Sequence, residues 1–228
     1  MTPTGLVVED LYVRISRARI IEGLSLSVGE GEIVGLAGRN GAGKTTTLRA
    51  ISGVESRRGA IVLDGVALPC KPEVVARMGV VHVPEGRGIF PDLTVNENIR
   101  LGLIAGGRGD AALREHLESV FPAVVELGNQ KAGRLSGGEQ QMVALFRGLA
   151  SRPKILLVDE MSLGLSPRAL KGAIEALVAI GRSERIGMLI VDQNSRMLSE
   201  HCDRMLLLKD GKAVGWDEAS DLAAAYFE

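Results

Sequence analysis

A glycine-rich segment at residues 38–45, GRNGAGKT, has the residue types and spacing of a phosphate-binding loop. Glycine lets consecutive backbone N–H groups turn inward around phosphate oxygens. The apolar run 33–37 predicts a buried strand before it, and residues 45–51 predict a helix whose N-terminus favours an anion. These flanks disfavour the alternative, a glycine turn with a solvent-exposed lysine. We therefore expect the phosphate-binding residues to be Gly38, Asn40, Gly41, Ala42, Gly43, Lys44, Thr45 and Thr46.

A second set of chemical groups follows the apolar run 155–158, which ends in Asp159 and Glu160. Buried parallel strands place ligand-binding residues at their carboxyl ends. Beside a triphosphate, Lys44 would hold the β- and γ-phosphates, while Thr45 and Asp159 would hold Mg²⁺. Glu160 would polarise the attacking water as a general base. An apolar run that ends in two acids is common on its own, so these roles depend on the phosphate loop.

The sequence LSGGEQQ at residues 135–141 narrows the class of nucleotidase. Ser136 and the glycines after it would expose N–H groups at the start of a helix, which suits an anion. A capped helix after a glycine turn is the alternative. The motif precedes the Asp159 strand and resembles the signature of the ABC ATPase family. That resemblance implies two ATP molecules between two subunits, each bound by Lys44 of one chain and by Ser136 and Gly138 of the other.

Longer segments resemble one branch of this family, the LivF-type ATPase subunits of branched-chain amino acid importers. They are residues 83–99 (VPEGRGIFPDLTVNENI), 162–167 (SLGLSP) and 191–194 (VDQN). The resemblance implies amino-acid uptake driven by ATP-dependent closure of a dimer, either with an identical chain or, as usual in this branch, with a paralogous one. It further implies transmembrane permease subunits, an external substrate-binding protein and a peripheral location on the cytoplasmic face of the membrane. Importers of amides and urea share much of the pattern.

Several positions differ from the commonest residues of the family. Glu85 stands where most members have a Gln that senses Mg²⁺ and the γ-phosphate, and Gln193 stands where most have a catalytic switch His; both are usual in the amino-acid importer branch. Because Gln brings no positive charge, hydrolysis by this site alone is expected to be slow. Ile15 stands where the family stacks adenine on an aromatic ring, and it offers no π-face. Met161 and Ser166 replace the usual Pro after the catalytic Glu and the usual Asp that links the two sites.

The elements that must position these residues form an α/β pattern with a helical interruption. Strands are expected at 24–28, 33–37, 61–63, 80–83, 155–158, 188–191 and 205–208, and core helices at 45–51 and 167–180. The resemblance implies a single ABC ATPase domain over residues 1–228, with a P-loop core of mixed sheet and an N-terminal antiparallel part. Its core would comprise residues 1–89 and 151–228, and its inserted α-helical subdomain residues 90–150.

Within the insert, local signals predict three helices. Thr94, followed three residues later by Glu97, predicts a capping box for a helix that reaches about residue 104. Residues 111–127 are predicted as one helix, after a flexible connection at residues 106–109. Ser136 is expected to cap the third helix, which reaches about residue 150.

Composition restricts the function further. The chain has 228 residues, and its net charge of −1 provides no general basic field, so we expect no nucleic-acid partner. Cys70 and Cys202 are too few and too far apart for a disulfide framework or a metal site. The first residues do not have the pattern of a signal peptide, and no apolar run approaches the ~20 residues that span a bilayer. A membrane role would therefore require a partner.

Three functional hypotheses remain from the sequence. The leading one is the importer ATPase. The second is a soluble ABC ATPase of DNA repair or translation; such proteins usually carry long coiled coils or two fused ATPase domains, whereas this sequence has one phosphate loop and no heptad arm. The third is a nucleotide-gated regulatory subunit with weak catalysis, which Ile15, Ser166 and Gln193 favour and the intact phosphate loop and acidic pair disfavour.

Overall fold

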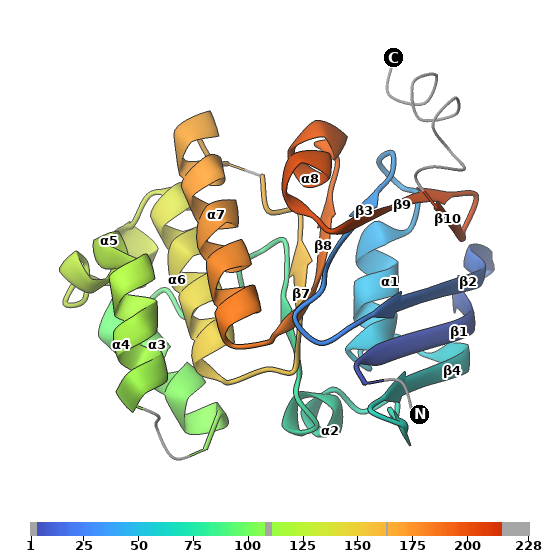
Figure 1. The fold of residues 1–228 in the computed structure, drawn as a ribbon, viewed down its shortest axis with the longest axis horizontal. Helices are drawn as coiled ribbons and strands as arrows, with labels where there is room; N and C mark the ends of the chain where they lie inside the picture. The colour runs from blue at the N-terminus through green and yellow to red at the C-terminus, as the bar shows by residue number, and fades with distance from the viewer. Residues whose placement is uncertain (1–3, 108–110, 163, 216–228) are drawn as a thin grey trace.

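A mostly parallel sheet crosses the centre of the molecule (Figure 1). The computed structural model describes residues 4–107, 111–162 and 164–215. Within these ranges the strand order of the central sheet is β10-β9-β3-β8-β7-β6. Its strands are β3 (Ile33–Ala37), β6 (Val80–Val83), β7 (Ile155–Asp159), β8 (Gly187–Asp192), β9 (Arg204–Lys209) and β10 (Lys212–Gly215). β10 pairs antiparallel with β9, and the other neighbours pair in parallel.

A second sheet is antiparallel, and its described strands have the order β2-β1-β4-β5. They are β1 (Leu6–Ile15), β2 (Ala18–Val28), β4 (Arg57–Leu63) and β5 (Val66–Ala67). The predicted hairpin turn at Asp64-Gly65 is confirmed, with φ of 50° and 81°, which a tight hairpin requires. The sequence patterns did not predict β1, because a register shift at Glu9 and Asp10 interrupts its alternation of apolar and polar residues.

Helices cover both faces of the central sheet. Helix α1 (Lys44–Ile51) lies between the two sheets, whereas α6 (Gly137–Ala150), α7 (Pro167–Ser183) and α8 (Ser195–His201) lie on the opposite side (Figure 1). In β7, Leu156 and Val158 pack toward α6 and α7, while Ile155 and Leu157 pack toward α1 and the antiparallel sheet. Strands that are buried on both faces are apolar throughout, which explains the continuous apolar runs of β3, β7 and β8.

The connection between β6 and β7 is largely helical. It contains α3 (Val95–Ala105), α4 (Ala111–Val120), α5 (Pro122–Glu126), a short 3₁₀ helix η1 (Ala132–Arg134) and α6, and a further helix, α2 (Pro72–Arg77), precedes β6. The predicted capping box at Thr94 with Glu97 is confirmed, and so is the predicted cap at Ser136, which forms a capping box with Glu139. Residues 108 and 109 of the predicted connection lie outside the described residues.

The single helix predicted for residues 111–127 is wrong. Helix α4 ends at Val120, and Phe121 adopts a non-helical conformation with φ −116° and ψ 56° before α5 begins at Pro122. Proline has no N–H group to donate to the preceding turn, and it disfavours the helical conformation of the residue before it. The break therefore follows from a signal that was present in the sequence.

The inserted helices share one apolar cluster with the central sheet. Val95, Leu117 and Phe146 belong to the same buried cluster as Val158 and Ile190. The division of the chain at residues 90 and 150 therefore stays a proposal, since it follows no break in the packing. None of the helices in the described ranges combines the length and the apolar character needed to cross a bilayer.

Replacement of Phe146 by Ala tests how much this shared cluster contributes to the stability of the fold. The Phe146 side chain is fully buried, and its ring centroid lies 5.8 Å from that of Phe121. We expect Phe146→Ala to lower the free energy of unfolding by about 3–5 kcal/mol, measured by urea titration, because it leaves a large cavity. Phe90, which is 51% exposed, is the matched control, and Phe90→Ala should cost less than about 1 kcal/mol. Equal losses of unfolding free energy from the two substitutions would contradict the assignment of Phe146 to the stabilising core.

Candidate active site

Four segments that are distant in sequence meet at the carboxyl edge of the central sheet. In the parallel register, Ala37 at the end of β3 lies beside Asp192 at the end of β8. Asp159 at the end of β7 lies beside Val191, and Val83 at the end of β6 lies beside Val158. Because parallel strands end at the same edge, the loops that follow them surround one volume.

The glycine-rich loop between β3 and α1 needs its glycines for conformation and for space. Gly41 and Gly43 have φ of 79° and 103°, values that residues with a Cβ rarely adopt. A Cβ on Gly43 would lie only 2.7 Å from the Cδ1 atom of Ile21. The loop thus lies directly against β2.

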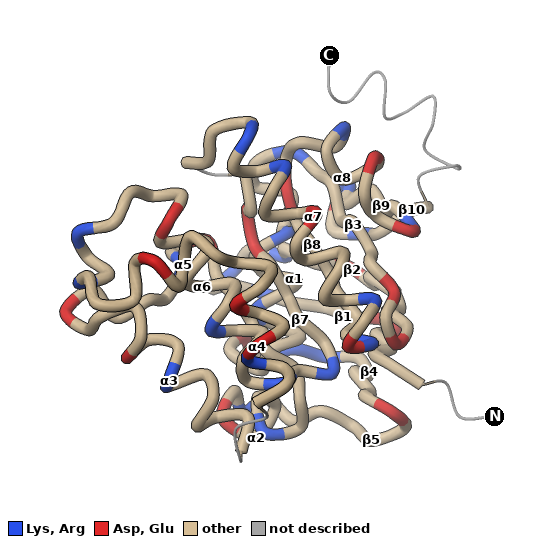
Figure 2. The backbone as a smooth tube through the Cα atoms, turned by 60° about the vertical axis from the view of Figure 1, so that its left-hand side comes forward, with Lys and Arg blue, Asp and Glu red and all other residues tan. Residues whose placement is uncertain are grey.

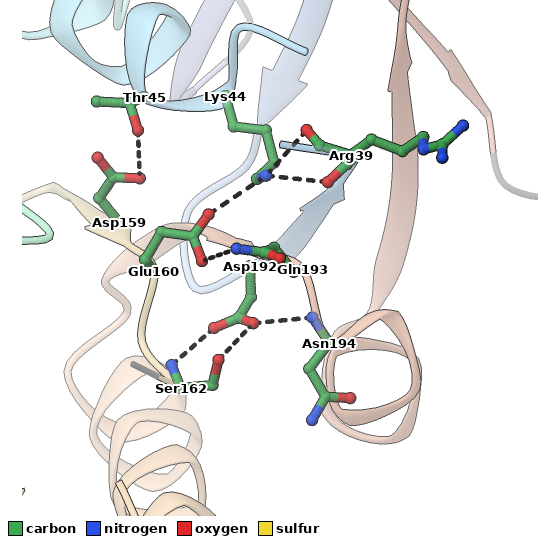
Figure 3. Close-up of polar contacts among 10 residues, drawn as sticks. Arg39, Lys44, Thr45, Asp159, Glu160, Ser162, Asp192, Gln193 and Asn194 are labelled. Atoms are coloured by element: carbon green, nitrogen blue, oxygen red, sulfur yellow. Dashed lines mark hydrogen bonds and ion pairs between the residues drawn. The ribbon is translucent and has the colours of Figure 1, made fainter. Parts of the chain in front are cut away.

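Lys44, the first residue of α1, folds back over this loop. Its side chain is almost fully buried, and Nζ donates hydrogen bonds to the carbonyl oxygens of Gly38 (2.9 Å) and Arg39 (3.3 Å). Nζ also lies 3.2 Å from Oε1 of Glu160 (Figure 3). The ammonium group is therefore held inside the loop by carbonyl oxygens and one carboxylate.

Glu160 is oriented from both sides. Its backbone has φ 49° and its N–H group donates to the carbonyl oxygen of Val191 at 2.8 Å, which turns the residue out of the line of β7. Gln193 Nε2 donates to Oε2 of Glu160 at 3.4 Å, and Lys44 contacts the other oxygen. The two predicted catalytic neighbours, Lys44 and Gln193, thus contact the same carboxylate (Figure 3).

Asp159 and Thr45 form the pair predicted to hold a metal. Asp159 is fully buried, and Oδ1 accepts a hydrogen bond from Thr45 Oγ1 at 3.1 Å, whereas Oδ2 has no hydrogen-bond partner in the described part of the chain. Burial, followed by smaller effects of the Glu160 and Glu85 charges, raises the pKa of Asp159 to about 6, although the hydrogen bond from Thr45 opposes this shift. A divalent cation beside Oδ2 would compensate for the buried charge, so these residues fit Mg²⁺.

A cavity of about 540 Å³ collects most of the predicted site residues. It is lined by Ile20, Asn40, Gly41, Gly43, Lys44, Thr45, Thr46, Glu85, Glu160 and Gln193. Among the described residues no three His, Cys, Asp or Glu side chains gather as a self-sufficient metal site. Mg²⁺ would therefore depend on phosphate oxygens for part of its coordination, as is usual in nucleotide sites. Ile20 was not among the predicted residues, because its exposure to the cavity depends on the approach of β2 to the loop.

Other predicted residues lie outside this cavity. Gly38 and Ala42 belong to the loop without lining the cavity, and Ala42 borders the neighbouring surface near Arg19. Ile15 ends β1 and is 41% exposed beside the β1–β2 turn. Ser136 and Gly138 stand at the start of α6 on another part of the surface, where the Ser136 hydroxyl shares a capping box with Glu139.

The loop after β6 connects the cavity to the start of α6. Glu85 lines the cavity, and two residues later Arg87 Nη1 donates to Oε1 of Gln140 at 3.0 Å. Gln140 in turn donates to the carbonyl oxygens of Ala132 and Leu135, just before Ser136. Arg87 has φ 62°, so this link includes a residue in the left-handed region.

Comparisons with known proteins agree with these features. The ABC transporter family model matches residues 21–162. The chain is 36% identical over 209 residues to the high-affinity branched-chain amino acid transport ATP-binding protein BraG of Pseudomonas aeruginosa, covering 90% of this chain and 89% of BraG. It is 35% identical over 220 residues to the lipopolysaccharide export system ATP-binding protein LptB of Escherichia coli, covering 92% of this chain and 88% of LptB.

A solved structure, "Structure of ATP binding subunit of ABC transporter", has a TM-score of 0.84 and 26% identity, and the match covers 99% of this chain and 95% of that chain. The predicted α/β fold of the ABC ATPase type is therefore confirmed. Together with the loop, the acidic strand end and the cavity between them, these similarities show that the chain belongs to the ABC transporter family, as an ATP-binding and ATP-hydrolysing subunit.

Proposed function

We propose that this subunit energises the import of branched-chain amino acids through transmembrane permease subunits and an external substrate-binding protein, as a peripheral component on the cytoplasmic face of the membrane. The observation that carries ATP hydrolysis is the gathering of Lys44, Thr45, Glu160 and Gln193 around one cavity, with Asp159 beneath it. The similarity to BraG supports the class of transported substrate.

The residues of the cavity would act on ATP in distinct ways. Lys44 and the loop N–H groups would bind the phosphate oxygens and offset the charge that develops on them. Glu160 would accept a proton from the attacking water, and Gln193 would orient that carboxylate. Mg²⁺, held by Thr45 and Asp159 near Glu85, would supply further neutralisation of phosphate charge. The exposed Ile15 would pack on the base.

A second ATPase subunit would complete the site. Ser136 and Gly138 do not line the cavity of their own chain, so in this proposal another chain would present this helix end to the phosphates. The first N–H groups of a helix have no intrahelical partner, so those of Gly137 and Gly138 are available to a phosphate oxygen. ATP would close the dimer because only the closed form makes these contacts. The mate would be an identical or a paralogous chain.

A groove between the sheet and the inserted helices suits the membrane partner. It has a volume of about 510 Å³, and its lining includes the exposed apolar side chains of Phe90, Leu101 and Ile104. The guanidinium of Arg147 lies 5.5 Å from the Phe90 ring centroid, and the buried Asn98 side chain bonds the backbone of Phe90. The loop from the cavity residue Glu85 to Phe90 would therefore connect ATP binding to the permease.

The similarity to LptB supports a second candidate, a role in lipopolysaccharide export. The soluble nucleic-acid machine has less support, because basic and acidic residues are interspersed over the described part of the chain (Figure 2). The identity of the permease decides between import and export, since the transported substrate is bound by other subunits.

Glu160→Gln tests the proposed general base. We expect ATP turnover, measured as phosphate release, to fall by about 100-fold or more, while ATP binding persists because the phosphate loop is unchanged. Glu184→Gln is the matched control, because Glu184 lies far from the cavity and pairs with His116. Turnover near that of the wild type in Glu160→Gln would contradict the base assignment. Phosphate release by the wild type that does not exceed a blank without protein would instead favour the weakly catalytic regulatory subunit.

Asp159→Asn tests the metal site through stability as well as activity. The pKa of Asp159 rises from 3.8 in the unfolded chain to about 6 in the fold, so the native state binds more protons in this interval and wild-type stability falls as pH rises through it. The amide side chain of the Asn variant does not ionise, so the stability of the variant does not fall in this way as the pH rises. Without Mg²⁺ and well above pH 6, its thermal unfolding midpoint should therefore exceed that of the wild type, with a smaller difference near pH 4.

The same measurement with Mg²⁺ and ATP should reverse that order, because only the wild type retains the metal ligand. An Asn variant that is less stable than the wild type without metal, or equally stabilised by Mg²⁺ and ATP, would contradict the assignment of Asp159.

Uptake measurements test the transported substrate. In cells that lack this chain, we expect uptake of labelled leucine to fall to background and to be restored by the wild type but not by Glu160→Gln. Affinity capture from membranes should identify a permease of the amino-acid importer type. Normal leucine uptake together with loss of surface lipopolysaccharide would contradict the import proposal and support a role in lipopolysaccharide export.

A further inference from the structure

A second fully buried carboxylate, Asp192, lies at the carboxyl edge beside the cavity. It ends β8, and its oxygens accept three hydrogen bonds: from Ser162 N–H to Oδ2 (2.7 Å), from Ser162 Oγ to Oδ1 (2.7 Å) and from Asn194 N–H to Oδ1 (2.8 Å). Asp192 forms no ion pair within the described ranges, so its charge is stabilised by these donors alone (Figure 3).

The three hydrogen bonds join the two segments that carry Glu160 and Gln193. Ser162 follows Glu160 by two residues, and Gln193 stands between Asp192 and Asn194. Between Glu160 and Ser162, the Met161 side chain is fully buried in the apolar cluster. The backbone bond from Glu160 N–H to Val191 holds the start of the first segment against β8, and the contact between Ser162 and Asp192 holds the part of that segment that follows Glu160.

We propose that Asp192 is a positioning residue for ATP hydrolysis, which fixes Glu160 against Gln193 by binding Ser162 and Asn194. This inference rests on the proposed role of Glu160 as general base. It assigns no direct contact with ATP to Asp192, because that side chain faces away from the cavity toward Ser162 (Figure 3).

The geometry explains why a carboxylate is needed at this position. An ionised Asp only accepts hydrogen bonds, whereas Asn would direct one NH₂ group at donors of Ser162 or Asn194. A buried donor without an acceptor is unfavourable, so the segment after Glu160 would shift away. Glu160 has φ 49° and its contact with Gln193 is 3.4 Å long, so a small shift would separate these two side chains. Displacement of a catalytic group by about 1 Å costs roughly 100-fold in rate.

Steady-state kinetics of Asp192→Asn and Ser162→Ala test this role. We expect Asp192→Asn to lower kcat by about 10- to 100-fold while KM for ATP changes by less than about twofold, because the phosphate loop is untouched. Ser162→Ala loses only the hydroxyl contact and should lower kcat by about fivefold, while Ser162→Thr, which keeps a hydroxyl, should restore it. In a Glu160→Gln background, Asp192→Asn should cause no further loss, since it acts through Glu160.

Asp203→Asn is the matched control. Asp203 also accepts a backbone N–H group, that of Ile33, but at the opposite end of β3 from the phosphate loop. We expect Asp203→Asn to lower the thermal unfolding midpoint and to leave kcat of the folded protein close to that of the wild type. An unchanged kcat in both Asp192→Asn and Ser162→Ala, or a further loss in the Glu160→Gln background, would overturn the proposal. If Asp192→Asn does not fold, the comparison of Ser162→Ala with Ser162→Thr tests the proposal by itself. These outcomes differ from failure of the base assignment, which would appear as normal turnover in Glu160→Gln.

Discussion

The parallel pairing of β3, β8, β7 and β6 is the constraint on which the active site depends. The loops after these strands are separated by long stretches of sequence, yet the register places Ala37 beside Asp192 and Asp159 beside Val191. Every proposed contact with the phosphates or Mg²⁺ within this chain comes from one of those loops or from the start of α1, whereas the proposed base contact, Ile15, lies at the end of β1. Because the strands are buried on both faces by apolar side chains, the edge is held by the whole core. The packing of the core thus determines how precisely the residues of the site are positioned.

Two buried carboxylates at neighbouring strand ends illustrate how environment separates roles. Asp192 has three hydrogen-bond donors and holds two segments together. Asp159 has one donor, Thr45, and burial raises its pKa, so its ionised form is disfavoured, and its Oδ2 atom has no partner in the described part of the chain until a cation binds. Lys44 and Glu160 offset each other at 3.2 Å. The arrangement is consistent with a site in which stability is reduced where a ligand is expected to bind.

Much of the site was predictable because its chemistry is local in sequence. The glycine spacing, the Asp159-Glu160 pair and the capping boxes at Thr94 and Ser136 all involve neighbouring residues, and β3 and β6 have the predicted bounds. β1 escaped prediction because a register shift disturbs its alternation, and the break at Pro122 was overlooked although proline signals it. The contact of Asp192 with Ser162 could not be predicted, because it requires two segments thirty residues apart to meet. The role proposed for Ser136 and Gly138 involves a second chain, which one sequence does not describe.

A structure of this chain with Mg²⁺ and a slowly hydrolysed ATP analogue tests the account most directly. It should show the phosphates on the N–H groups of the loop at 41–45, Mg²⁺ on Thr45 and Asp159, and Glu160 and Gln193 facing the terminal phosphate. In a dimer, the Ser136 end of the mate should contact the same nucleotide. Nucleotide bound elsewhere, or a metal ion that does not touch Asp159, would contradict the central claim that the carboxyl edge of the sheet is the site of hydrolysis.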